Sequence, residues 1–112
     1  MKILFYDTKS YDREFFEKLL PSYPGIEIKF IEANIHEETA ALAHGYDAIC
    51  AFVNADLGAP VIEELHRQGV KLILMRCAGY NNVDLETTAK CGIQVARVPG
   101  YSPEAITFIP KP

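Results

Sequence analysis

The chain has 112 residues, the length of one domain, and its 49% hydrophobic and 23% charged residues are ordinary for a globular protein. The net charge of −4 and the scattered basic residues argue against a nucleic-acid-binding surface. No apolar run approaches the ~20 residues that a membrane-spanning helix needs.

Three cysteines are present, and they are too far apart for a Cys-x-x-Cys zinc or redox motif. Their odd number also gives no disulfide framework. The apolar start, Met1–Phe5, is too short for a signal-peptide core. We therefore expect a cytoplasmic protein without a metal site.

Short apolar runs alternate with helical patterns along the chain. The runs are continuous rather than alternating, which is typical of strands covered on both faces. The expected strands are Lys2–Tyr6, Ile26–Ile31, Ala48–Val53, Lys71–Met75 and Ile93–Val98.

Four helices are expected between these strands. The first is Tyr11–Leu20, ended by Pro21. Asn34 and Glu37 resemble a capping box that opens a short helix ending at Gly45.

Proline, aspartate and glycine mark the other two helices. Pro60 suits the first turn of a helix that Gly69 closes, and Asp84 can cap a last helix, Leu85–Cys91, that Gly92 closes.

This order of elements predicts an α/β fold with a flavodoxin-like parallel sheet of strand order 2-1-3-4-5 and helices on both faces. Ligands of such folds bind outside the carboxyl ends of the strands, at the switch point. The expected ligand edge is formed by Asp7–Ser10, Asn54–Gly58 and Cys77–Asn82.

Two loops stand out at this edge. In the first, Ala78 and Gly79 could let backbone N–H groups approach a carboxylate closely, or the glycine could serve only a tight turn. Spacing alone favours the tight turn. In the second, Tyr101 could contact a substrate or pack at a domain edge, and the residues leave this open.

Other polar residues carry weaker signals. Arg76 could bind an anion, but we favour an ion pair with Asp84 or another surface acid. We expect the histidines to be solvated and the cysteines to be buried apolar residues, with Cys77 the one worth testing. The sequence has no Gly-x-Gly-x-x-Gly fingerprint, P-loop or nucleophile elbow, and no residue stands out as a general acid or base.

Several motifs together resemble the amino-terminal part of the NAD-dependent D-2-hydroxyacid dehydrogenases, and within them the D-lactate dehydrogenases. The resemblance runs from residue 1 to about residue 105. Its most specific parts are Phe52-Val53-Asn54, Gly69-Val70-Lys71, Arg76–Leu85 and Arg97-Val98-Pro99 with Tyr101–Ala105.

The resemblance implies that a parent enzyme reduces a 2-oxo acid such as pyruvate to the D-2-hydroxy acid, with NADH as hydride donor. It also implies that backbone amides at Ala78 and Gly79 meet the substrate carboxylate and that Tyr101 lines the substrate site. Asn54, in the loop after the third strand, is a further candidate.

The family's nucleotide-binding domain, which follows near residue 105, has no counterpart in this sequence, nor have its catalytic Arg and Glu–His pair. We therefore expect residues 1–105 to form a substrate domain without NAD, followed by an atypical tail at 106–112. The residues from Ser102 to Ala105 predict the start of a helix, and the two prolines of the tail, Pro110 and Pro112, are expected to end it early.

We expect this domain to be inactive by itself. The alternatives are a flavodoxin-like module that self-associates through apolar surface left uncovered, and one part of an enzyme completed by a separate nucleotide-binding chain. The expected partners are a small 2-oxo acid and further copies of the chain.

Overall fold

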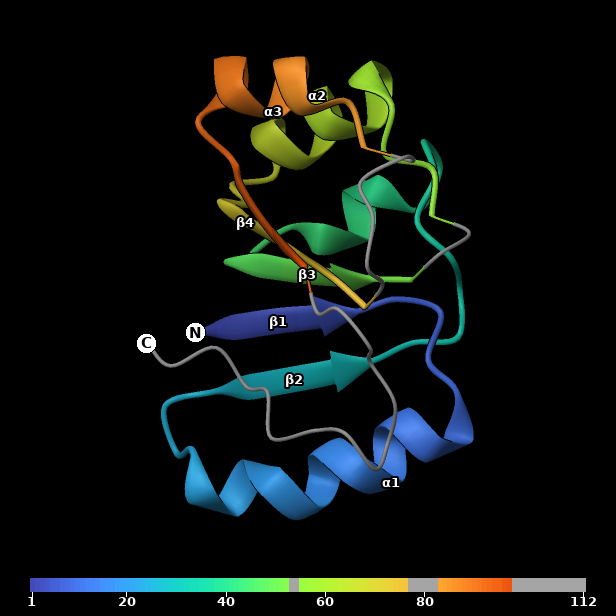
Figure 1. Cartoon of the computed structure of the whole chain (residues 1–112), viewed down its shortest axis with the longest axis vertical. Helices are drawn as coiled ribbons and strands as arrows, with labels where there is room; N and C mark the ends of the chain where they lie inside the picture. Colours follow the sequence, from blue (N-terminus) through green and yellow to red (C-terminus); the bar gives the residue numbers. More distant parts are fainter. Residues whose placement is uncertain (53–54, 77–82, 98–112) are drawn as a thin grey trace.

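The computed structural model describes residues 1–52, 55–76 and 83–97. At its centre lies a five-stranded sheet of order β2-β1-β3-β4-β5, and every neighbouring pair is parallel (Figure 1). The strands are β1 Lys2–Phe5, β2 Glu27–Phe30, β3 Ala48–Ala51, β4 Leu72–Met75 and β5 Gln94–Arg97. The predicted fold class and strand order are confirmed.

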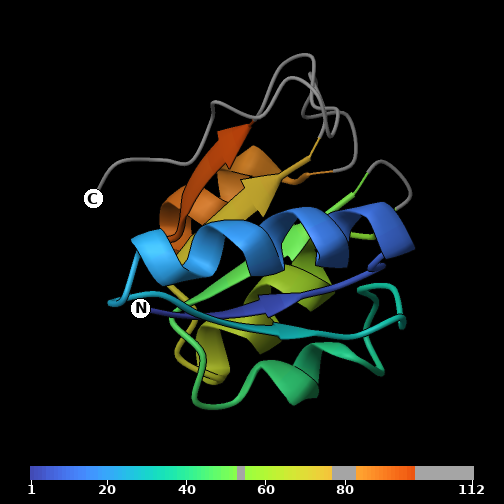
Figure 2. The same cartoon turned by 90° about the horizontal axis from the view of Figure 1, so that it is seen from below.

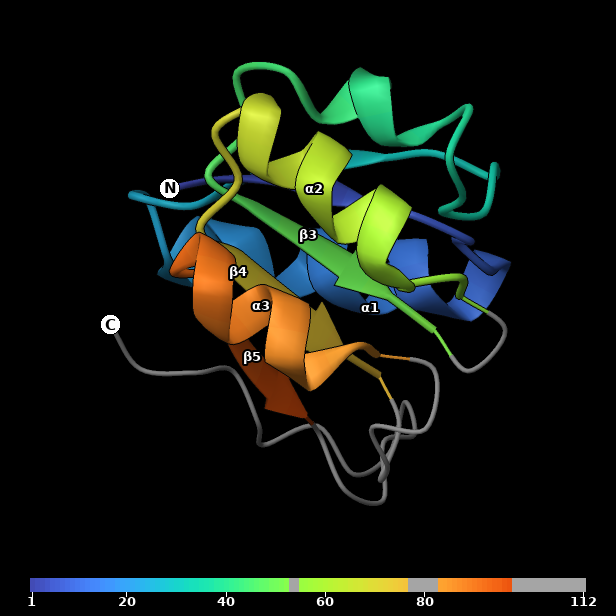
Figure 3. The same cartoon turned by 90° about the horizontal axis from the view of Figure 1, so that it is seen from above.

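Helices lie on both faces of the sheet. They are the α-helices α1 Ser10–Leu19, α2 Ala59–Arg67 and α3 Leu85–Cys91, and the 3₁₀ helices η1 Leu20–Ser22 and η2 Ala40–Ala43. Figure 2 shows α1 on one side of the sheet, and Figure 3 shows α2 and α3 on the other. Parallel strands connect by right-handed crossovers. The step from β1 to β2 runs opposite to the later steps, so α1 falls on the opposite face.

Alternate strand residues build two hydrophobic cores. On the α1 side, Ile3 and Phe5 pack with Cys50, and the ring of Phe16 meets that of Phe5 edge-on at 5.1 Å. The larger core lies under α2, α3 and η2. It includes Leu4, Tyr6, Ile49, Ile62, Leu65 and Ile73.

The two later helices begin and end at the predicted residues. Pro60 lies in the first turn of α2, and Gly69, with φ 91°, follows its end. The Asp84 carboxylate accepts a hydrogen bond from the Thr87 amide at 3.0 Å and caps α3, and Gly92 ends it with φ 70°. Only glycine adopts such left-handed angles without strain.

The predicted capped helix from Asn34 to Gly45 is wrong. The Asn34 side chain accepts from the neighbouring Ile35 amide at 2.9 Å, and the chain forms only the 3₁₀ turn η2. The Thr39 carbonyl, which an α-helix would use internally, accepts the Tyr6 hydroxyl at 2.8 Å. Local and tertiary hydrogen bonds thus replace those of the helix.

Tyr6→Phe tests the bond between β1 and the Thr39 carbonyl. Burial raises the pKa of the fully buried Tyr6, so its hydroxyl stays protonated as a donor. Losing it leaves the carbonyl without this donor and should cost about 1 kcal/mol, or roughly 4–8 °C in Tm. Thermal unfolding followed by circular dichroism measures the change. Tyr11→Phe, at an exposed tyrosine, is the control and should leave Tm unchanged.

Asp84→Ala tests the α3 cap. The Thr87 amide lowers the pKa of Asp84 in the folded protein. The cap therefore stabilises α3 fully above the unfolded pKa of about 4, and this stabilisation is lost as the pH falls through the lower folded pKa. We expect Asp84→Ala to lower Tm at neutral pH and the difference from wild type to shrink in acid. Asp84→Asn, a cap that does not titrate, should keep most of the stability at neutral pH. A difference that persists unchanged in acid would contradict this account.

Candidate functional site

The carboxyl ends of β1, β3, β4 and β5 meet at one edge of the sheet. The predicted site residues Asn54, Ala78, Gly79 and Tyr101 follow these ends but lie outside the described residues, as does Cys77. The described part of this edge consists of the segments that lead into and out of those positions. These segments are organised around Arg76.

Arg76 lies directly after β4, and its side chain is only 1% exposed. The expected pairing with Asp84 or another surface acid is wrong. The guanidinium instead forms a buried ion pair with Asp12 of α1, with 2.7 Å between Nη1 and Oδ2. A buried charge needs such a partner because desolvation is costly.

The same guanidinium also reaches the end of β1. Its Nη2 donates to the Tyr6 carbonyl and, at 3.2 Å, to the Asp7 carbonyl. The cation lies over two aromatic rings, 4.2 Å from the centroid of Phe5 and 4.9 Å from that of Phe52. One side chain thus connects β1, α1, the end of β3 and the end of β4.

Asp7 leaves β1 in an unusual conformation. Its φ of 52° is the one left-handed value among the described non-glycine residues. Its carbonyl is bound by Arg76, and its carboxylate pairs with Lys9 at 2.8 Å. That hydrogen bond to Asp7 raises the pKa of Lys9. The turn between β1 and α1 is therefore held by the ion pair of Asp7 with Lys9 and by the hydrogen bond from Arg76 to the Asp7 carbonyl.

The segment that follows residue 82 is anchored too. Val83 forms a parallel bridge with Leu57, and the Asp84 amide donates to the Leu57 carbonyl at 2.9 Å. On the other side, the Arg76 amide donates to the Ala51 carbonyl at 2.8 Å. Described residues therefore hold the chain on both sides of residues 77–82.

No complete acid–base pair lies among the described residues of this edge. Of its carboxylates, Asp7 and Asp12 are each paired with a cation, and Asp56 accepts the Gly58 amide at 3.2 Å. Burial raises the pKa of the Cys50 thiol to about 12 although the nearby Arg76 acts in the opposite direction, so this thiol stays protonated. The histidines are exposed, as predicted; they are His36, His44 and His66.

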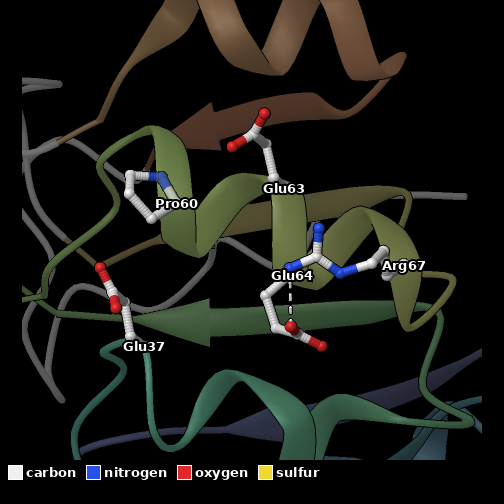
Figure 4. Close-up of a pocket in the computed structure, with 5 residues that line it drawn as sticks. All are labelled: Glu37, Pro60, Glu63, Glu64 and Arg67. Atoms are coloured by element: carbon white, nitrogen blue, oxygen red, sulfur yellow. Dashed lines mark hydrogen bonds and ion pairs between the residues drawn. The ribbon is translucent and has the colours of Figure 1, made fainter.

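A separate shallow pocket of about 210 Å³ lies between α2 and the segment after β2 (Figure 4). It is lined by Glu37, Pro60, Glu63, Glu64 and Arg67. Arg67 pairs with Glu64 at 2.8 Å and lowers its pKa. Three carboxylates against one guanidinium make this pocket unsuitable for an anionic substrate.

Two further features concern residues 1–52, 55–76 and 83–97. Neither a metal-binding cluster of His, Cys, Asp and Glu nor a helix able to cross a membrane was found there.

Sequence reasoning missed Asp12 as the partner of Arg76. Asp12 occupies the same helical stripe as Phe15, Phe16 and Leu19, at spacings i, i+3, i+4 and i+7. An acid within an apolar stripe is a signal of a buried ion pair, and it could have identified Asp12 but not its partner.

Sequence comparison finds relatives along almost the whole chain. The D-lactate dehydrogenase of Escherichia coli (strain K12) is 46% identical over 106 residues, which cover 95% of this chain and 32% of that protein. A 2-hydroxyacid dehydrogenase homolog of Haemophilus influenzae is 45% identical with the same coverage. The chain thus spans about a third of the length of these relatives.

Solved structures agree with this result. The apo-structure of D-lactate dehydrogenase from Escherichia coli superposes with a TM-score of 0.86 at 46% identity, covering 95% of this chain and 33% of that one. The D-isomer specific 2-hydroxyacid dehydrogenase from Lactobacillus delbrueckii ssp. bulgaricus, in its NAD complexed form, gives a TM-score of 0.81 at 28% identity, covering 95% and 32%. Residues 3–107 match the family described as D-isomer specific 2-hydroxyacid dehydrogenase, catalytic domain, and the chain belongs to this family.

Proposed function

We propose that this chain is the substrate domain of a D-lactate dehydrogenase-like protein and that it binds the carboxylate of a small 2-oxo acid such as pyruvate. Backbone amides of Ala78 and Gly79 are the proposed carboxylate donors, with Tyr101 and Asn54 lining the same site. Residues 1–105 form the proposed domain, and residues 106–112 form a tail. The observation that carries this proposal is the 46% identity to the Escherichia coli D-lactate dehydrogenase along 95% of the chain.

The charge of the described edge supports an anionic ligand. Arg76 is neutralised by Asp12, and Asp7 is neutralised by Lys9. These two pairings lower the repulsion that a substrate carboxylate would meet at this edge, where Asp56 is a further carboxylate and accepts the Gly58 amide at 3.2 Å. Backbone N–H groups of a loop can bind such a group without a charged side chain.

The chain does not fit a nicotinamide dinucleotide. Its binding motif needs glycines directly after a strand, where the backbone approaches the pyrophosphate. Of the five described glycines, Gly25, Gly45, Gly69 and Gly92 lie before strands at the opposite edge of the sheet, and Gly58 lies at the start of α2; the sequence has no Gly-x-Gly-x-x-Gly. We infer that this chain supplies no NAD site and is inactive by itself.

One surface favours a second role, association with further protein. On the α1 side, the strand residues Leu72, Leu74 and Ala96 stay partly exposed, and we call them the β4–β5 face. Among the described elements, only α1 and η1 cover this side of the sheet. Partly exposed apolar side chains on a sheet favour burial against a partner. We propose that copies of the chain associate through this face, or that a separate nucleotide-binding chain completes the enzyme there.

The cysteines are consistent with a reducing compartment. Cys50 and Cys91 are free thiols, and Cys50 is buried. On this basis we infer a cytoplasmic location.

The purified chain should not oxidise NADH in the presence of pyruvate. Hydride transfer needs a bound nicotinamide and a proton donor, and we infer that the chain supplies neither, since its sequence has no dinucleotide fingerprint and no acid–base pair lies at the described edge. NADH absorbance measures the reaction, and the full-length Escherichia coli D-lactate dehydrogenase is the positive control. Turnover above a blank without protein would contradict the proposal of inactivity.

Pyruvate should nevertheless shift the backbone amide signals of Ala78 and Gly79 in a ¹⁵N NMR titration. Acetaldehyde, which lacks the carboxylate, is the matched control and should leave them in place. Equal responses to the two compounds, or none to pyruvate, would refute a carboxylate site at these residues.

Leu74→Glu should abolish self-association, because burying the new carboxylate on the β4–β5 face against a second copy is costly without an opposite charge to pair with it. Sedimentation velocity over a range of concentrations measures the change. Leu42→Glu, at a 54% exposed leucine of η2, is the control and should associate as wild type does. A monomeric wild-type chain at every concentration would exclude association through this face.

A further inference from the structure

The α1 side of the sheet has room for a second helix. The ring of Phe16 meets that of Phe5 in β1. The guanidinium of Arg13 lies 5.3 Å from the ring centroid of Phe30 in β2, so α1 covers these two strands. Neighbouring packed helices lie about 8–10 Å apart, which is roughly two strand spacings. A neighbour of α1 toward β5 would therefore lie over β4, where no described helix lies on this side (Figure 2).

The strands at this position are apolar on the α1 side. Leu72 is in register with Gln94, and Leu74 with Ala96, so these side chains point to the same face. Leu72 and Leu74 pack against the core on the α1 side and remain partly exposed. Gln94 is exposed on the edge strand. The β4–β5 face is therefore a surface onto which one apolar helix stripe can pack.

α1 adds an apolar flank to this surface. Phe15 lies about 160° around the helix axis from Arg13, which faces β2, so Phe15 lies on the flank toward β4. The contact of Asp12 with Arg76, directly after β4, agrees with this orientation. Leu19, one turn on from Phe15, shares the flank, and both side chains are partly exposed. A helix beside α1 would meet apolar side chains from the sheet and from α1.

A second copy of α1 would not suit this position. Its exposed side carries two ion pairs, Arg13 with Glu17 at 3.7 Å and Glu14 with Lys18 at 3.6 Å. Burying these charges against leucines costs desolvation without new partners. The position therefore requires a helix with an uncharged apolar stripe.

The sequence after β5 contains such a stripe. Residues 98–112 continue directly from β5, the edge strand that borders this surface. Ser102 and Pro103 predict a helix start, and Pro110 predicts its end. Between them, apolar residues recur at i, i+3 and i+4; they are Ala105, Phe108 and Ile109. Seven helical residues span about 10 Å and a strand of four residues about 13 Å, so the length fits as well.

We propose that the segment 102–109 folds back as a short helix onto the β4–β5 face, with its apolar stripe against the sheet. An isolated helix of this length is unstable in water, so the contact itself stabilises it. The linker 98–101 reaches about 13 Å at most, which keeps the segment beside β5 at a high effective concentration. The segment then competes with a second copy for the face. This competition, unlike the contact, rests on the self-association proposed above.

Phe108 gives a direct readout in the 112-residue chain. Nuclear Overhauser effects should connect its ring to the methyl groups of Leu72 and Leu74, and the ring current should shift those methyl signals upfield. Phe108→Leu, which keeps an apolar side chain without a ring, should remove the upfield shift. A wild-type chain without these Overhauser effects would overturn the inference. Effects found only between labelled and unlabelled copies in a mixed sample would overturn it too, since a second copy would then supply the segment.

Phe108→Asp should release the segment, because burying an unpaired carboxylate is costly. We expect the amide signals of the β4–β5 face to move and those of α2 to stay in place. Thr107→Asp is the matched control. Thr107 lies opposite the stripe on the expected helix, so the same charge there should leave the signals of the face unchanged. Equal changes in the two variants would refute a docked stripe.

Sedimentation velocity tests the competition separately. Phe108→Asp should associate at about tenfold lower concentration than wild type, and Thr107→Asp should behave as wild type does. Association of Phe108→Asp at the same concentration as wild type would refute the competition. If all three chains are monomeric at every concentration, the proposed self-association fails and the competition with it. The Overhauser effects then still decide whether the segment lies on the face.

Discussion

The carboxyl edge of the sheet depends on one buried guanidinium. Arg76 binds the carboxylate of Asp12, two carbonyls at the end of β1 and the faces of two aromatic rings. These groups belong to α1 and to the ends of β1 and β3, so one side chain that follows β4 contacts three other elements. The left-handed turn at Asp7 is stable in this setting because its carbonyl and its carboxylate are both bound.

The two edges of the sheet have different chemistry. The amino ends of β2, β3, β4 and β5 are each preceded by a glycine, which lets the chain turn tightly from a helix into a strand. At the carboxyl ends, the ion pair of Arg76 and Asp12 is buried. Parallel α/β folds generally bind their ligands at that edge.

Apolar runs were enough to predict the sheet: those of β1, β3 and β4 are continuous, as is typical of strands covered on both faces, while in β2 charged and apolar residues alternate. The helix expected after Asn34 does not form, and the Thr39 carbonyl instead accepts a hydrogen bond from the hydroxyl of Tyr6, which is far away in the sequence. Arg76 was misassigned for the same reason: its partner Asp12 is 64 positions away. The pairing of such distant residues leaves no periodic signal, although the position of Asp12 in an apolar helical stripe marks it as one member of a buried pair. The expected site residues Ala78, Gly79, Tyr101 and Asn54 remain predictions.

The outer strand β2 has a further consequence. Its exposed residues, Glu27 and Lys29, carry opposite charges and alternate with the partly buried Ile28 and Phe30. No described strand pairs with its outer edge, and charges on such an edge discourage the addition of another strand. Strand addition at β2 is thus unfavourable, while the β4–β5 face lies at the other end of the sheet.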